Sequence, residues 1–195
     1  IFWEAAAGLP DGFPALADFN GDLSPEVVVS AGGTVRIHDG ETGELVWGPV
    51  TIPAFGGSGD GGNIGPPTIA DFDGDDDSAN NDPDLEIGVA GSSQYVALDI
   101  DASTFSTSST PTPDFSSVKL WSYETQDVSS SMTGSSVFDF EGDGKAEVIY
   151  NDELTMRVFD GTTGSVLFSK TNTSFTAFEY PIIADVDNDG ASEIV

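Results

Sequence analysis

The sequence predicts an all-β protein, and within that class a β-propeller built of four-stranded antiparallel blades. Three observations lead to this prediction: an aspartate-rich segment recurs four times, a glycine-containing hairpin pattern recurs between those segments, and no stretch shows helical periodicity. Four strands repeated in tandem, in units of roughly 46 residues, describe a propeller blade. A β-sandwich or an open β-solenoid is the alternative, but neither architecture requires the same loop four times at the same strand junction.

The acidic segments are the first repeated element. They read DFNGDLSPEVVV (18–29), DFDGDDDSANNDPDLEIGV (71–89), DFEGDGKAEVIY (139–150) and DVDNDGASEIV (185–195). Each follows a short apolar stretch and precedes a run rich in β-branched residues, so both flanks suit strands and are too short for helices. We therefore expect each acidic segment to form a loop between the first two strands of a blade.

The second repeated element is a pair of strands joined by a turn. The segments TVRIHDGETGELVW (34–47) and TMRVFDGTTGSVLF (155–168) match closely. A glycine-containing turn between alternating apolar and polar positions is the signature of a hairpin. YVALD (95–99) and VKLW (118–121) are the same pair with a long insertion in place of the turn. These pairs are expected to supply the third and fourth strands of each blade.

Together the two elements divide the chain into blades of one partial propeller domain that spans residues 1–195. The blades cover approximately 13–50, 65–125, 134–170 and 179–195, the last of them incomplete, and residues 1–5 hold the last strand of a preceding blade. Exposed strand edges promote aggregation. We therefore expect the chain to be part of a longer polypeptide, or neighbouring copies to supply the missing strands.

Several residues outside the repeats carry their own expectations. Residues 51–66 are a glycine-rich connection. Residues 103–117 hold ten Ser or Thr, which favours a flexible, solvated excursion over the alternative of a loop that carries O-linked sugars. Asn172 begins an N-glycosylation sequon. His38, the one histidine, is expected to be exposed on a third strand.

Aromatic residues recur near the end of the fourth strand. Trp3, Trp47 and Trp121 occupy this position, and Phe168 stands in the equivalent place of the third full blade. The periodicity predicts packing between blades rather than a platform for sugars.

Composition narrows the choice of partners. The net charge is −29 with only five Lys and Arg, which argues against nucleic acid or anionic lipid as a partner and favours cations. The chain has no cysteine, so neither disulfides nor thiolate metal sites can form, and one histidine leaves little for zinc. No apolar run reaches the roughly 18 residues of a membrane helix.

The spacing within the acidic segments predicts four calcium sites. Counted from the first aspartate, oxygen-bearing side chains stand at positions 1, 3, 5 and 9, and alternate residues of a tight turn can converge on one cation. Position 7 shares no side-chain chemistry, which indicates a backbone carbonyl ligand. The predicted ligands are Asp18, Asn20, Asp22, Ser24 and Glu26 in loop one; Asp71, Asp73, Asp75 and Glu86 in loop two; Asp139, Glu141, Asp143, Lys145 and Glu147 in loop three; and Asp185, Asp187, Asp189, Ala191 and Glu193 in loop four.

Loop two is longer than the others, so its closing ligand stays open between Glu86, Asp84 and Asp82. Hard oxygen donors in a flexible loop favour Ca²⁺ over Mg²⁺, which demands a stricter octahedron. An EF-hand needs an acid at position 12, where Val29 and Tyr150 stand, and helices on both sides. Plain polar turns are the remaining alternative, but the four loops hold 19 of the 34 acidic residues, which repel one another unless a cation binds.

These motifs resemble FG-GAP/VCBS-type repeats, the calcium-binding blades of integrin α-chain-like propellers and of many secreted proteins. The resemblance rests on ADFNGD, ADFDGD, FDFEGD and ADVDNDG, each followed by a Glu-led strand, and it covers almost the whole chain. It implies a propeller with three to four Ca²⁺ ions, each in the loop that joins the first two strands of a blade. The enlarged second loop departs from the pattern.

The sequence leaves three functions to weigh. The favoured one is a non-catalytic extracellular or cell-surface module for binding or adhesion, stapled by calcium, with glycans or copies of itself as partners. A carbohydrate-active enzyme, or an accessory domain of one, is the alternative, because propellers can present paired carboxylates. A building block of an extracellular filament is the third.

Overall fold

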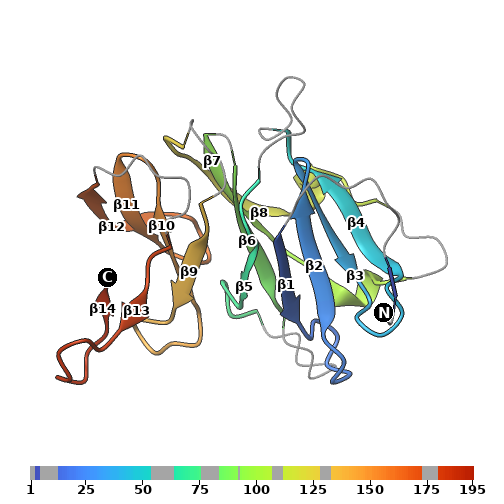
Figure 1. The fold of residues 1–195 in the computed structure, drawn as a ribbon, viewed down its shortest axis with the longest axis horizontal. Coiled ribbons are helices and arrows are strands. Elements are labelled where there is room, and N and C mark those ends of the chain that lie inside the picture. Colours follow the sequence, from blue (N-terminus) through green and yellow to red (C-terminus); the bar gives the residue numbers. More distant parts are fainter. Residues whose placement is uncertain are drawn as a thin grey trace.

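The computed structural model describes residues 3–4, 13–53, 64–75, 84–91, 93–106, 112–127, 133–172 and 180–195. These residues form three four-stranded antiparallel sheets, one two-stranded sheet and two short helical turns. Figure 1 shows the sheets in chain order, from sheet one on the right to the two-stranded sheet on the left. The all-β class and the four-stranded antiparallel organisation predicted from the sequence are therefore confirmed.

Sheet one illustrates how the sequence pattern becomes structure. In β2, buried and half-buried residues alternate from Glu26 to Ser30, because successive side chains of a strand point to opposite faces. Each strand is antiparallel to the next in chain order. The strands are β1 (Phe13–Ala17), β2 (Glu26–Ala31), β3 (Thr34–His38) and β4 (Leu45–Thr51).

The other sheets repeat this order. Sheet two consists of β5 (Thr68–Ala70), β6 (Glu86–Gly91), β7 (Gln94–Leu98) and β8 (Lys119–Glu124). Sheet three consists of β9 (Ser135–Phe138), β10 (Glu147–Asn151), β11 (Thr155–Phe159) and β12 (Val166–Thr171). The two-stranded sheet pairs β13 (Ile183–Ala184) with β14 (Glu193–Ile194). The hairpins predicted at 34–47 and 155–168 are confirmed, and so is the pairing of β7 with β8 across the insertion.

Neighbouring full sheets touch through their first strands. β1 lies against β5, and β5 lies against β9. As a result, the four loops that join a first strand to a second strand all project from one end of the molecule, at the bottom of Figure 1. This arrangement places every predicted metal ligand on the same end.

Two buried clusters hold the sheets together. The cluster between sheets one and two is mostly aliphatic, and the cluster between sheets two and three is mostly aromatic. Their largest members include Trp47, Phe19, Ile37 and Leu98 in the first, and Phe72, Tyr95, Trp121, Tyr150 and Phe159 in the second. Each such side chain contributes about 1.5–3 kcal/mol when it leaves water.

The indole ring of Trp121 at the end of sheet two packs on a turn of sheet three, as the sequence predicted, and that of Trp3 packs in the same way on a turn of sheet one. Trp121 of β8 donates its Nε1–H to the carbonyl oxygen of Gly161 at 2.5 Å, in the turn between β11 and β12. Trp3 makes the corresponding bond with Gly40 at 2.9 Å, in the turn between β3 and β4. A Cβ at Gly164 would lie 2.5 Å from the Trp121 ring, so the close approach requires glycine.

His38 is buried, and the expectation of an exposed histidine is wrong. Its side chain is 8% exposed, because the Trp3 ring stacks on it with a centroid distance of 6.3 Å. Its Nδ1 lies 3.0 Å from the carbonyl oxygen of Gly43. The covering residue is distant in sequence, so the local pattern around His38 carried no sign of it.

The insertion in sheet two contains two helical turns, which the sequence reading did not expect. A 3₁₀ turn spans Ala102–Thr104, and α1 (Phe115–Val118) is a single α-turn. Asp101 caps the first turn by accepting the N–H of Ser103 at 3.0 Å, so the Asp at this position was the usable signal. Within the described ranges no helix is long and apolar enough to cross a membrane.

The insertion also packs against sheet one. Phe105 lies on Phe19 with a ring-centroid distance of 6.2 Å, and the backbone N–H of Ser106 donates to Val46 at 3.2 Å. The predicted solvated excursion is therefore anchored at this end, whereas residues 107–111 and most of the glycine-rich 51–66 connection lie outside the described residues.

The predicted N-glycosylation site is only partly described. The side-chain amide of Asn172 donates to the carbonyl oxygen of Asp152 at 3.3 Å, and the rest of the sequon lies outside the described residues. A glycan on Asn172 would take the place of one Nδ2 hydrogen and leave the other for this bond.

Candidate metal centres

Every acidic loop is closed by the same hydrogen bond. The glutamate at the start of the second strand accepts the backbone N–H of the residue that follows the first aspartate. The pairs are Glu26 with Phe19 at 2.9 Å, Glu86 with Phe72 at 2.5 Å, Glu147 with Phe140 at 2.8 Å and Glu193 with Val186 at 2.9 Å. The bond fixes one carboxylate oxygen at the base of the loop and leaves the second oxygen for another partner.

The first aspartate of each loop shapes the turn above that base. In loop three, Asp139 accepts the N–H groups of Gly142 at 2.6 Å, Asp143 at 3.1 Å and Gly144 at 2.9 Å. Asp185 accepts the corresponding bonds in loop four. Gly142 and Gly144 have φ values of 71° and 93°, in the left-handed region that favours glycine. The recurring glycines of the motif suit this backbone path, although Leu23 and Asn188 adopt φ values of 72° and 61° at equivalent positions of loops one and four.

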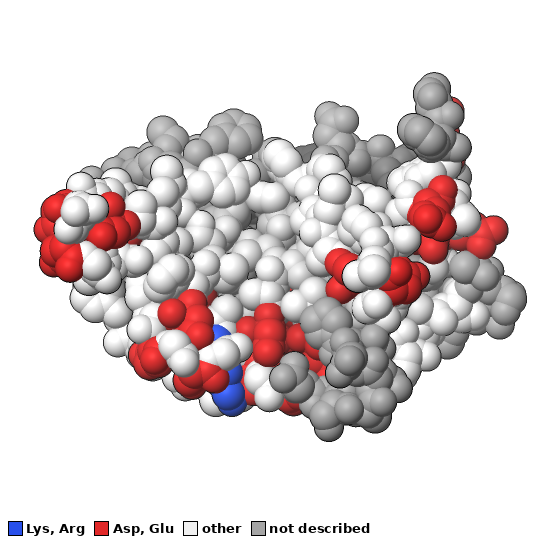
Figure 2. Space-filling model, turned by 90° about the horizontal axis from the view of Figure 1, so that it is seen from below, with Lys and Arg blue, Asp and Glu red and all other residues white. Residues whose placement is uncertain are grey.

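Carboxylates converge in three of the four loops. One oxygen from each of three residues lies within 4.8 Å of the other two. The groups are Asp71, Asp73 and Glu86; Asp139, Glu141 and Glu147; and Asp185, Asp187 and Glu193. Calcium–oxygen distances of about 2.3–2.6 Å place opposite ligands about 5 Å apart, so each group has the spacing of oxygens around one such ion. Figure 2 shows the acidic side chains gathered in separate patches on this face.

Loop one differs because Asn20 stands at its third position. The Asn20 amide donates to Oε1 of Glu26 at 3.1 Å and so ties the asparagine to the closing glutamate. Oδ1 of Asp18 is buried and accepts no hydrogen bond from the described part of the chain. A buried oxygen without a partner costs free energy, and a cation at this position would satisfy it. The loop-one donor set therefore fits a hard cation as well.

Loop two closes on Glu86. Its carboxylate converges with those of Asp71 and Asp73, and it makes the same kind of closing bond as the glutamates of the shorter loops. Asp84 instead lies near Asp99: burial raises the pKa of Asp99, and the charges of Asp75 and Asp84 raise it further. Asp82 lies outside the described residues.

Fifth-position aspartates bind the backbone of their own loops and lie outside the three groups. They accept the backbone N–H of the residue at position 7: Asp22 accepts that of Ser24 at 2.7 Å, Asp143 that of Lys145 at 3.0 Å and Asp189 that of Ala191 at 2.8 Å. A backbone contact at position 7 is indifferent to the side chain, which agrees with the unlike residues found there. That the carbonyl groups at position 7 and the carboxylates at position 5 bind the metal stays a prediction.

Burial raises the pKa of the closing glutamates Glu26, Glu86 and Glu147. The pKa of Glu86 rises to about 8, mainly through burial and then through the charges of Asp73 and Asp71, against the lowering effect of the Phe72 N–H. The pKa of Glu26 is also raised, again first by burial. Such groups give up their protons readily only when a positive charge is near. A bound divalent cation would supply that charge and keep the clustered acids ionised together.

Two buried carboxylates at the opposite end of the sheets were missed by the sequence reading. Asp127 accepts the hydroxyl of Tyr150 at 3.1 Å, and Asp152 forms an ion pair with Arg157 at 2.5 Å. Asp152 also accepts the backbone N–H of Gln126 at 3.0 Å, so it ties the end of sheet two to sheet three. These contacts are structural, and the Asp at the β10–β11 turn was the only local signal.

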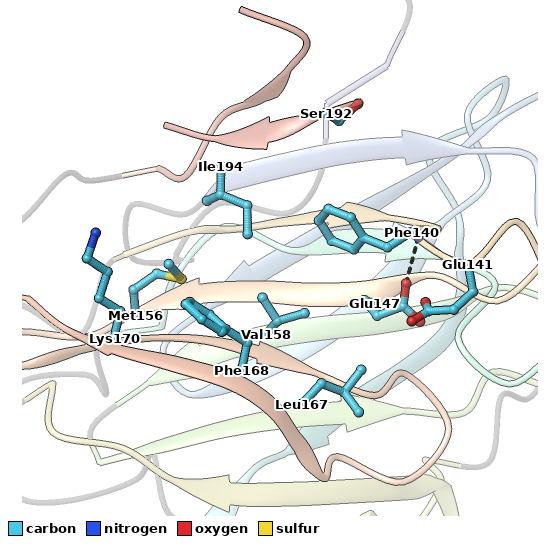
Figure 3. Close-up of a pocket in the computed structure, with 10 residues that line it drawn as sticks. All are labelled: Phe140, Glu141, Glu147, Met156, Val158, Leu167, Phe168, Lys170, Ser192 and Ile194. Atoms are coloured by element: carbon cyan, nitrogen blue, oxygen red, sulfur yellow. Dashed lines mark hydrogen bonds between the residues drawn. The ribbon is translucent and has the colours of Figure 1, made fainter. Parts of the chain in front are cut away.

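A pocket of about 440 Å³ adjoins loop three (Figure 3). Its lining includes Phe140, Leu167, Phe168 and Ile194, and the carboxylates of loop three lie at one end. Phe168 is 51% exposed, although its counterpart Trp121 is buried. The packing predicted for Phe168 is therefore not found among the described residues.

Neither a protein-family model nor a curated protein sequence matches the chain. Among solved structures, the biofilm matrix protein Bap1 of V. cholerae is similar over 93% of this chain and 52% of its own, with 17% sequence identity and a TM-score of 0.57. The rhamnogalacturonan lyase YesW is similar over 94% of this chain and 43% of its own, with 14% identity and a TM-score of 0.46. This chain thus spans about half the length of these proteins, and at such identity the similarity to Bap1 concerns the fold alone.

Proposed function

We propose that the four acidic loops bind Ca²⁺ and that the sheets are blades of an FG-GAP/VCBS-type propeller. The observation that carries this proposal is the common closure of the loops, in which a glutamate is held by one N–H in all four and joins two further carboxylates in three. The orphaned oxygen of Asp18 supports a cation in the fourth. The contact of successive first strands is the arrangement that blades around an axis would have.

We further propose that the module acts outside the cell, in binding, adhesion or assembly, without catalysing a reaction. The chain has no cysteine for disulfides, so calcium would take the place of a covalent staple. The clustered acids all lie in loops where they accept backbone N–H groups, an environment suited to holding a cation. The net charge of −29 favours some partners over others, because it repels anionic surfaces. Glycans, or copies of the same chain joined through shared cations, are the more suitable partners.

Calorimetric titration of calcium into EDTA-stripped full chain tests the proposal. We expect three to four sites with dissociation constants of about 10⁻⁴–10⁻³ M, the range of extracellular calcium modules. Calcium should also raise the melting temperature, because a ligand that binds only the folded state stabilises it by about 2.7 kcal/mol per site at a hundredfold excess over Kd.

Matched variants identify the sites. Asp187→Ala should remove one site and part of the thermal stabilisation, whereas Glu44→Gln, which removes an exposed charge outside the loops, should change neither. Fewer than two sites, or identical melting curves with and without EDTA, would contradict the proposal.

A further inference from the structure

Loops two and three touch each other, and loop three contributes a lysine to the contact. The stem of Lys145 lies across Gly74 of loop two: a Cβ on that glycine would stand 2.9 Å from Cε and 3.1 Å from Cγ of the lysine. Lys145 is half-buried there. In Figure 2 a basic side chain is seen between two acidic patches. The chain has only five Lys and Arg, and Lys145 is one of them.

The contact is held in place by the backbone around it. The N–H of Ala146, next to Lys145, donates to the carbonyl oxygen of Asp71 at 2.8 Å. Thr162 of the next turn donates its hydroxyl to the carbonyl oxygen of Phe72 at 3.2 Å, and Gly161 packs on that same carbonyl group. These bonds fix the base of the lysine relative to the carboxylates of loop two. Among the described residues, no backbone hydrogen bond joins loop one to loop two or loop three to loop four.

We infer that Lys145 is a built-in counter-charge for loop two, which stabilises the metal-free loop and weakens the binding of calcium there. This inference rests on the proposed calcium sites. A positive charge carried on a stem that lies against Gly74 lowers the mutual repulsion of the loop-two carboxylates when no metal is bound, and it repels an incoming Ca²⁺. The corresponding positions of loops one and four hold Ser24 and Ala191, which carry no charge. Loop two therefore differs from loops one and four in its calcium affinity, and the residue that causes the difference belongs to loop three.

Replacing the lysine should move two measurements in opposite directions. In Lys145→Met, which keeps the length of the stem, the loop-two site should bind calcium about three- to tenfold more tightly. The melting temperature of the same variant in EDTA should fall. A lysine that served only to pack on Gly74 would leave both measurements close to those of the unmodified chain, because methionine keeps the stem that makes the contact. The gain in affinity should also shrink in about 1 M salt, where the screening length is only about 3 Å.

Three further variants make the outcome decisive. Lys145→Arg retains the charge and should retain the weaker site, and Lys170→Met removes a lysine that lies away from the loop-three carboxylates in Figure 3 and should change nothing. In an Asp73→Asn background, which disables loop two, Lys145→Met should no longer tighten any site.

Unchanged affinity in Lys145→Met, or a tightened site that survives in the Asp73→Asn background, would overturn the inference. A wild-type chain that binds no calcium would instead refute the proposed function, so the two failures are distinguishable.

Discussion

Two regions of the molecule contain similar aromatic residues but differ in solvent exposure. One is the boundary between sheets two and three, and the other is the open face of sheet three. At the boundary, Trp121 is 6% exposed beneath the Gly161 turn, and Phe72 of loop two is fully buried. On the open face, Phe168 is 51% exposed and Phe140 of loop three is 37% exposed. The residue types are alike, so the difference is the hairpin that packs on one face and has no counterpart among the described residues on the other.

This comparison shows where the stability of such a repeat resides. In tandem repeats each unit is stabilised mainly by the interface with its neighbour, because one unit cannot bury its own apolar face. Sheet three has the strand order of the other sheets, yet every residue of β12 is exposed. The same sequence pattern therefore specifies a sheet in both places but completes a core in only one.

The largest expected effect comes from breaking the covered boundary. Trp121→Ala removes a ring that stacks on Tyr95 at 5.6 Å and packs on Phe159 at 5.7 Å, and it should cost about 3–5 kcal/mol of unfolding free energy. Urea denaturation measures the loss. Trp121→Phe keeps a ring but loses the bond to Gly161, and should cost less. A loss below about 1 kcal/mol for the alanine variant would mean that the boundary is not where the stability resides.

The covered loop two should also give the metal-free protein a pH dependence. The pKa of Glu86 is about 8 in the folded chain against an ordinary value of 4.5, so the folded state binds this proton more tightly than the unfolded state. Its stabilisation is complete below the ordinary pKa and is lost as the pH rises toward 8, with a slope of at most about 1.4 kcal/mol per pH unit. Acids with lowered pKa values, such as Asp152, act at lower pH, whereas Glu26 and Asp99, whose pKa values are also raised, change the stability in the same direction as Glu86.

Melting temperatures in EDTA between pH 5 and pH 8 test this expectation. The curve should fall across the window in the unmodified chain and fall less steeply in Glu86→Gln. It should also fall less steeply when calcium is saturating, because the cation then holds the carboxylate ionised. A metal-free protein that gains stability across the same window would show that the sign is wrong.

The smallest effect is expected on the open face. Phe168→Ala removes a ring that is half in water, and the unfolding free energy should change by less than about 0.5 kcal/mol. The same urea denaturation measures it. A loss as large as that of Trp121→Ala, growing with protein concentration, would show instead that another chain covers this face in solution.

Much of the fold was predictable because its signals are local. The strand order, the two hairpins and the closing glutamates follow from motifs of about a dozen residues that recur along the chain, and the structure has the strands at those places. The choice of Glu86 could not be made from spacing alone, since the second loop is longer, and it needed the bond to the Phe72 N–H.

The features that escaped prediction are contacts between distant segments. The burial of His38 depends on Trp3, the anchoring of the insertion depends on Phe105 reaching Phe19, and Lys145 meets Gly74 only because two loops become neighbours. No short motif encodes which units lie side by side. The propeller arrangement, the bound metal and the extracellular role stay predictions for the same reason, because each depends on more than a local pattern.

The closing bond of the loops also defines a place where the chain can be lengthened. Phe19 and Glu26 are seven positions apart, whereas Phe72 and Glu86 are fourteen positions apart, and both pairs make the same contact. The two ends of an acidic loop are thus held together whatever the length between them. Foreign peptides grafted between Asp75 and Asp84 would emerge from a closed base, beside a carboxylate group suited to a cation, without disturbing the register of β5 and β6.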